Sequence, residues 1–153
     1  MCIQQTLFRI LIALFILFGI NQPLHARQDQ DATPLKDANS WINKGDLCAV
    51  YGNDKAAIRY YRKALELEPN NSRTLFHLGI SYGEVGRYSQ AIAFINKALA
   101  INSLNGIYYY GRGRVRLLSG EREKAIEDFK QAAVLSNRDA QHYLQNTLKI
   151  EWQ

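Results

Sequence analysis

The sequence is poor in the residues that build chemical sites and cross-links. It has two cysteines and three histidines among 153 residues. Cys2 lies in a segment that we expect to be removed, so no intrachain disulfide framework is predicted. His77 and His142 have no neighbouring cysteine or carboxylate at ligand spacing, which argues against a metal site, and no serine stands in a nucleophile-elbow context. We therefore expect a non-enzymatic protein without a metal or cofactor.

Proline is also scarce, with three residues, and glycine does not occur in runs. This composition excludes low-complexity disorder over most of the length. Hydrophobic residues make up 47% and charged residues 22% of the chain, which is ordinary for a folded domain. The net charge of +5 is too small to indicate a polyanionic partner, so no nucleic-acid partner is expected.

Long apolar runs are absent except near the N-terminus. Arg9 precedes an uninterrupted apolar run at residues 10–20, and Pro23 and a small residue, Ala26, follow it. This order of positive charge, apolar run and small residue is typical of a secretory signal. A run of this length is short for a bilayer span, which needs about 20 residues. The alternative, an uncleaved membrane anchor, stays open.

These features predict the organisation of the N-terminal part. Residues 1–26 are a signal peptide or membrane anchor, and the polar residues 27–37 are a linker. We expect an exported protein, periplasmic or secreted, or one held at the membrane by residues 1–20. A membrane partner is expected only if this segment stays uncleaved.

After the linker, the sequence repeats itself at a fixed spacing. Gly45, Gly79 and Gly113 follow one another at this spacing. Five columns keep one residue type through all three copies: Gly45, Gly79 and Gly113; Gly52, Gly86 and Gly120; Ala57, Ala91 and Ala125; Ile58, Ile92 and Ile126; Ala64, Ala98 and Ala132. A fixed period of this length is the signature of a stacked repeat protein.

Each repeat predicts two helices. Apolar residues at steps of three and four mark a first helix, with a glycine such as Gly79 where the second helix crosses closely. A second glycine, such as Gly86, suits a left-handed C-terminal cap. Alanines such as Ala91 and Ala98 line the second helix. We therefore predict an all-α fold of three antiparallel helix pairs at 38–71, 72–105 and 106–139, closed by a polar-backed capping helix at 140–153.

The pattern resembles the tetratricopeptide repeat family. The first copy carries the family's signature residues in order and spacing at Trp41, Gly45, Ala57, Tyr61, Ala64 and Pro69. The second copy does so at Leu78, Gly79, Tyr82, Gly86, Tyr88, Ala91 and Ala98. The chain departs from the pattern at Lys44, Cys48 and Asp54, and at Arg112, Arg116 and Arg122. The resemblance implies an α-solenoid and a small exported bacterial-type member of the family.

The resemblance also implies a site. In this family the first helices line a concave groove that binds a peptide or helix of another protein. Carried over to this sequence, the groove would present Ile42, Asn43, Asp46, Arg73, Phe76, His77, Ile80, Tyr110, Arg114 and Leu144. Family members that clamp acidic chaperone tails use Lys, Asn and Arg at places where this chain has Ile42, Asp46, His77, Ile107 and Gly111. That clamp is therefore not expected here.

The third repeat has an unusual run of tyrosines followed by Arg112, Arg114 and Arg116. Alternate residues point about 200° apart on a helix, so the three arginines do not form one stripe. We expect Arg114 in the groove. Arg112 and Arg116 are expected near the second helix, paired with an acid such as Glu84 or Glu127.

Two functions remain in competition. The first is a non-catalytic scaffold that binds a partner protein in its groove. The second is a membrane-anchored subunit of a larger cell-envelope assembly. An enzyme is the third possibility, and nothing in the sequence supports it.

Overall fold

The computed structural model describes residues 37–149. The predicted signal segment 1–26, most of the linker and the last four residues of the predicted capping helix lie outside the described residues. Within 37–149 the chain forms helices and turns, with no strand. None of the helices in this range has the length and apolar character needed to cross a membrane.

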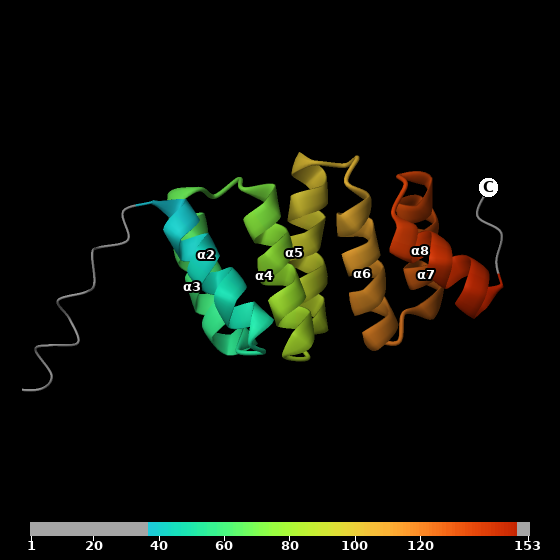
Figure 1. Ribbon diagram of the computed structural model, residues 1–153, viewed down its shortest axis with the longest axis horizontal. Coiled ribbons are helices and arrows are strands. Elements are labelled where there is room, and N and C mark those ends of the chain that lie inside the picture. Colours follow the sequence, from blue (N-terminus) through green and yellow to red (C-terminus); the bar gives the residue numbers. More distant parts are fainter. Residues whose placement is uncertain (1–36, 150–153) are drawn as a thin grey trace, which may run out of the picture. The chain divides into compact units, whose positions relative to one another are not determined.

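The helices follow one another as antiparallel pairs (Figure 1). Their bounds are α2 Ala38–Val50 with α3 Asp54–Leu67, α4 Ser72–Glu84 with α5 Tyr88–Ile101, and α6 Gly106–Leu118 with α7 Arg122–Val134. Each pair also packs against the next, through α3 on α4 and α5 on α6. The predicted all-α solenoid of three antiparallel pairs is confirmed.

The repeated glycines explain why each pair closes in the same way. A Cβ added to Gly79 would lie 2.6 Å from Ile95 Cγ1 and 3.0 Å from the carbonyl oxygen of Ala91, so only glycine permits this crossing. The turn glycines Gly52, Gly86 and Gly120 have φ of 72°, 78° and 86°, in the left-handed region that favours glycine. Both sequence predictions for these glycines are confirmed.

Polar caps set where the first helices begin. The side chains of Asn71 and Asn105 accept hydrogen bonds from the backbone N–H groups of Thr74 and Ile107, each at 3.0 Å. Such caps satisfy N–H groups that have no partner within the helix.

The C-terminal cap differs from its prediction. It begins at Arg138, where Asn137 caps the helix by accepting from the Ala140 N–H at 2.9 Å. It is also not one regular helix: the short α8 (Arg138–His142) continues as a π-helical segment, η2 (Tyr143–Leu148). The cap still closes the stack, because Ala140 and the apolar side chains of η2 pack on α7.

Candidate partner-binding face of the first helices

The first helices of the three pairs form a continuous layer. α4 contacts both α2 and α6, which brings the predicted groove residues from three repeats together. We call the exposed and half-buried members of this set the first-helix face. It comprises Asn43, Asp46, Arg73, Phe76, His77, Ile80, Tyr110 and Arg114.

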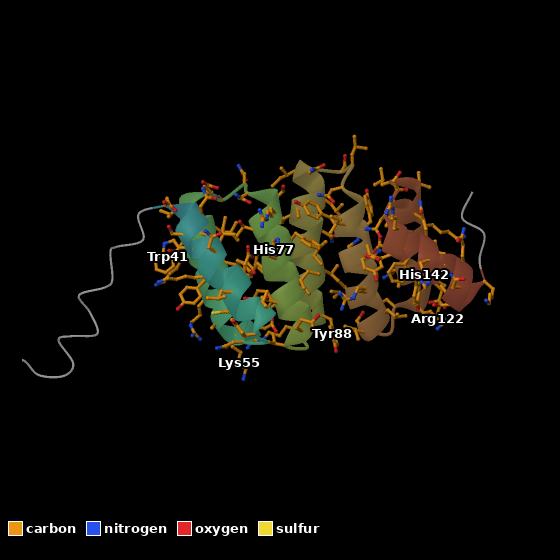
Figure 2. The ribbon with its side chains drawn as sticks, in the orientation of Figure 1. Trp41, Lys55, His77, Tyr88, Arg122 and His142 are labelled. Carbon is orange, nitrogen blue, oxygen red and sulfur yellow. The ribbon has the colours of Figure 1, made fainter. Side chains whose placement is uncertain are left out.

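A polar cluster centred on Asp46 joins α2 to α4 on this face. Asp46 Oδ1 accepts a hydrogen bond from the buried Tyr61 hydroxyl at 2.8 Å. Asp46 also pairs with Arg73 at 3.5 Å and lies 3.7 Å from His77 Nδ1. Arg73 Nε donates to His77 Nε2 at 3.4 Å. Figure 2 shows His77 at the centre of the first two pairs. The Asp46 carboxylate is therefore held by three groups from two other helices.

Burial changes the acid–base properties of this cluster. Loss of solvent raises the pKa of the Tyr61 hydroxyl, and its hydrogen bond to the Asp46 carboxylate raises it further. Burial also lowers the pKa of His77 from its ordinary 6.5, an effect that Asp46 opposes and Arg73 reinforces. The face therefore presents a neutral imidazole beside an arginine at neutral pH.

The apolar members of the face also hold the stack together. The Phe76 ring stacks on Tyr108 with ring centroids 4.7 Å apart. A Cβ on Gly111 would lie 2.5 Å from Phe76 Cε2 and 3.0 Å from Ile80 Cδ1, so Gly111 makes room for both side chains. Tyr110 lies against Phe129, with centroids 5.6 Å apart. The side chains of Phe76, Ile80 and Tyr110 are half-buried, so each has one side in the core and one side available to solvent.

The charged members at the edge of the face are held weakly. Arg114 pairs with Glu84 at 3.7 Å, and about half of each side chain is exposed. Arg73 is more exposed still. Exposed pairs of this kind contribute about 0–1 kcal/mol. Asn43 is exposed on α2. Arg73, Arg114 and Asn43 can therefore exchange their present surroundings for a partner at little cost.

Two residues assigned to the groove do not line it. Ile42 is buried with Ala38 and Ala64, and Leu144 is fully buried in the C-terminal cluster. Both occupy the same repeat position as Phe76 and Tyr110. The aromatic rings are long enough to reach the surface from this position, whereas the shorter aliphatic side chains end beneath it. The assignment of Ile42 and Leu144 to the face is wrong.

The expected ion pairs of the third repeat also need correction. Arg112 and Arg116 do not pair with Glu84 or Glu127. Both bind Asp128 on α7, at 2.6 Å and 2.9 Å. The sequence contains a signal for this pairing: Asp128 stands at a repeat position that Tyr60 and Phe94 occupy in the other copies. A lone acid in an aromatic position predicts a buried partner of opposite charge.

A recess lies elsewhere, at the turns that join the pairs. It has a volume of about 470 Å³ and is lined by Leu104, Ile107 and Leu135 together with the asparagines and Arg138 around them. Among residues 37–149 no group of three or more His, Cys, Asp or Glu is arranged to hold a metal ion.

Comparison with known proteins agrees with this architecture. Three antiparallel pairs in one repeating geometry define an α-solenoid. Two family models described as tetratricopeptide repeat match residues 38–71 and 60–93. A solved structure of MamA protein superposes with a TM-score of 0.61 at 29% identity, over 70% of this chain and 60% of that one. The first TPR of Spaghetti (RPAP3), bound to the HSP90 peptide SRMEEVD, superposes with a TM-score of 0.67 at 23% identity, over 74% and 91%.

Curated proteins also match part of the chain. Hsc70-interacting protein 1 of Drosophila melanogaster is 35% identical over 96 residues, which is 60% of this chain and 25% of that protein. Anaphase-promoting complex subunit 3 of Schizosaccharomyces pombe is 23% identical over 111 residues, or 72% and 17%. The chain thus spans a quarter or less of the length of these relatives. The family models thus support tetratricopeptide repeats at residues 38–93, and the superpositions show the same fold over 70% and 74% of the chain.

Proposed function

We propose that this protein is a non-catalytic scaffold that binds a peptide or helix of another protein on the first-helix face. The observation that carries the proposal is the make-up of that face. Weakly held charged side chains, Arg73 and Arg114, surround half-buried apolar ones, Phe76, Ile80 and Tyr110. An apolar centre within a polar rim is the usual anatomy of a protein-binding surface.

The similar proteins support a peptide ligand but suggest a different chemistry. The Spaghetti domain is described with an HSP90 peptide that carries three acidic residues. Here Asp46 lies on the face where α2 meets α4, already bonded to Tyr61 and paired with Arg73. An acidic tail placed against Asp46 would be repelled. We therefore propose a partner segment with an apolar side chain for Phe76 and Ile80, and without an acidic cluster.

The proposed location is outside the cytoplasm. The order of Arg9, the apolar run at 10–20 and Ala26 supports export and removal of residues 1–26, as a small bacterial-type periplasmic or secreted protein. The alternative is a subunit of a cell-envelope assembly, held at the membrane by residues 1–20. N-terminal sequencing of the native protein separates the two. A start near Arg27 supports export, and a start at Met1 supports the anchor.

Site-specific crosslinking tests the binding face. A photo-crosslinking residue at Asn43 or Arg114 should capture a discrete partner in the native host, because both positions are exposed members of the first-helix face. The same residue at Glu123, exposed on the second helix α7, is the matched control. Arg73→Ala should reduce capture without changing helicity. Equal capture from all three positions, or capture that Arg73→Ala leaves intact, contradicts the proposed face.

A further inference from the structure

One repeat position has very different surroundings in the three copies. Leu47, Ser81 and Val115 stand one repeat period apart on α2, α4 and α6. Ser81 is 1% exposed and Val115 is 3% exposed, whereas Leu47 is 57% exposed. Leu47 on α2 is thus the apolar side chain at this position that no element covers in the described part of the chain.

The covering element in the other copies is a helix. The preceding pair packs on these helices, chiefly through its second helix, α3 on α4 and α5 on α6, and Val115 also lies against Gly83 of α4. At the opposite end of the stack, α8 and η2 close the last pair. For α2 the described residues contain no preceding pair. We call its uncovered side the stacking face: Ser40, Lys44, Leu47 and Tyr51, with Val50 beside them.

The charge of the stacking face is one-sided. Lys44 stands where Leu78 is buried in the second copy. Lys44 and Lys63 lie over the Trp41 ring, at 5.7 Å and 4.3 Å from its centroid. The one carboxylate within α2, Asp46, is engaged on the other side with Tyr61 and Arg73. Figure 2 shows Trp41 at the outer edge of the first pair. The carboxylate of Asp37, next to Ser40, is also engaged, because it caps α2 by accepting from the Ser40 N–H at 2.7 Å. Apolar side chains beside Lys44, with the neighbouring carboxylates already engaged, fit an occupant that is both apolar and acidic.

We propose that the stacking face of α2 binds an amphipathic helix of a partner protein, which takes the place on α2 that α3 holds on α4 and sets a carboxylate against Lys44. The repeat-to-repeat interface then continues by one more helix. The apolar stripe of the partner packs on Leu47, Val50 and Tyr51. This surface is separate from the first-helix face, and its occupation leaves that face open.

The other occupants fit less well. One period before Ala57, Tyr61 and Ala64, this chain has Pro23, Arg27 and Gln30. These residues lack the small and apolar pattern of a second helix, so their sequence predicts no second helix in frame. A second copy would place Lys44 against an equally basic surface. Three apolar side chains also expose only a few hundred Å², which suits one helix rather than the roughly 800 Å² per partner of a stable dimer.

Helix-constrained peptides and the full-length chain test the proposal. The first probe has the sequence of residues 53–68, because this helix covers the equivalent side of α4 in the chain itself. The second probe is the same peptide with Arg62→Glu, since Asn96, one repeat period after Arg62, contacts Arg112, which stands at the repeat position of Lys44. Binding of each labelled peptide is measured by fluorescence anisotropy.

The charge complementarity predicts opposite preferences. The acidic probe should bind the natural chain about tenfold more tightly than the Lys44→Leu variant, while the unchanged probe should prefer Lys44→Leu. Leu47→Glu should weaken both probes by about tenfold or more. The matched control is Leu118→Glu on α6, where the side chain is 55% exposed and lies outside the stacking face. Leu118→Glu and Arg73→Ala should leave both affinities unchanged.

The proposal is wrong if neither peptide binds, or if Leu47→Glu has no effect on binding. It is also wrong if the chain sediments with phosphatidylcholine–phosphatidylserine vesicles in a Leu47-dependent way without binding either peptide, in which case a membrane covers the face. A Leu47-dependent dimer in sedimentation equilibrium assigns the face to a second copy. Loss of crosslinking from Asn43 with peptide binding intact would count against the first-helix face alone.

Discussion

The second and third helix pairs have different kinds of residue at the same two repeat positions: aromatic residues in the second pair and charged residues in the third. In the second pair, Tyr82 on α4 and Phe94 on α5 stack with ring centroids 5.4 Å apart and planes 2° from parallel. In the third pair, Arg116 and Asp128 stand at these positions and form an ion pair of 2.9 Å. Arg112, in the place of Leu78, adds a second contact to Asp128. The helix packing is the same, and its chemistry is not.

This difference separates what the repeat requires from what it tolerates. Both pairs keep the glycine crossing and the alanines of the second helix. The space beside the crossing accepts either aromatic rings or charges, provided that each charge has a partner. The ionic version is more demanding. Asp128 is 3% exposed, and the buried Nε of Arg116 has no acceptor among the described residues.

The largest expected effect is the loss of Asp128. Asp128→Ala leaves the largely buried side chains of Arg112 and Arg116 without a counter-charge, and breaking a buried pair in this way costs about 3–5 kcal/mol. We expect that loss in the free energy of unfolding measured by urea denaturation. Asp139→Ala, which removes an exposed carboxylate from α8, is the control and should change stability by less than about 0.5 kcal/mol. Similar values for the two variants would show that Asp128 is not the centre of the network.

A transplant of the second pair into the third tests whether the two solutions are equivalent. The triple variant Arg112→Leu, Arg116→Tyr and Asp128→Phe recreates Leu78, Tyr82 and Phe94. Replacement of buried charges by well-packed apolar residues is often neutral or stabilising by about 1–4 kcal/mol. We therefore expect an equal or higher urea midpoint. Each single change should destabilise. A triple variant as unstable as Asp128→Ala would mean that the third pair is shaped around its charges.

The shared glycine crossing should respond alike in both pairs. The Cβ added by Gly113→Ala would lie 2.7 Å from Phe129 Cε1, and that of Gly79→Ala would lie 2.6 Å from Ile95 Cγ1. Overpacking of this kind costs about 1–3 kcal/mol and outweighs the helix propensity gained, which is about 1 kcal/mol. Thermal unfolding should show a net loss of up to about 2 kcal/mol in both. Ala93→Gly, at an exposed position of α5, is the control that measures helix propensity alone. Unequal losses would indicate that the two helices of the second pair and those of the third pair pack differently at the glycine crossing.

The elements that recur were predictable from the sequence because they follow directly from spacing. Gly45, Gly79 and Gly113 mark each crossing, and the alanines opposite mark the second helix. These positions depend on contacts within one pair, whose geometry the repeat period already specifies. The three-pair solenoid followed from them.

The details that depend on side-chain reach and helix register were not predictable in the same way. Ile42 and Tyr110 share a repeat position, but only the longer side chain reaches the surface. Glu127 and Asp128 are neighbours on α7 and point about 100° apart, so the register between α6 and α7 decides which one meets Arg112. The π-helical turn of the cap has no signal in the periodicity.

The smallest expected effect concerns the polar cluster between the first two pairs. Burial lowers the pKa of His77, so the unfolded chain binds this proton more readily than the folded chain does. Stability should therefore rise with pH through the range around 6.5 and fall as the imidazole becomes charged below it. A third of the side chain stays exposed, which keeps the effect small. Between about pH 8 and about pH 5, the natural chain should lose more stability than His77→Gln in urea titrations. Equal losses would mean that Asp46 compensates the charge in full. A larger loss for the natural chain would mean that the protonated imidazole of His77 destabilises the second pair because Asp46, already bonded to Tyr61 and Arg73, does not compensate its charge in full. The second pair would then resemble the third in one respect: a partly buried charge is tolerated only where a carboxylate neutralises it.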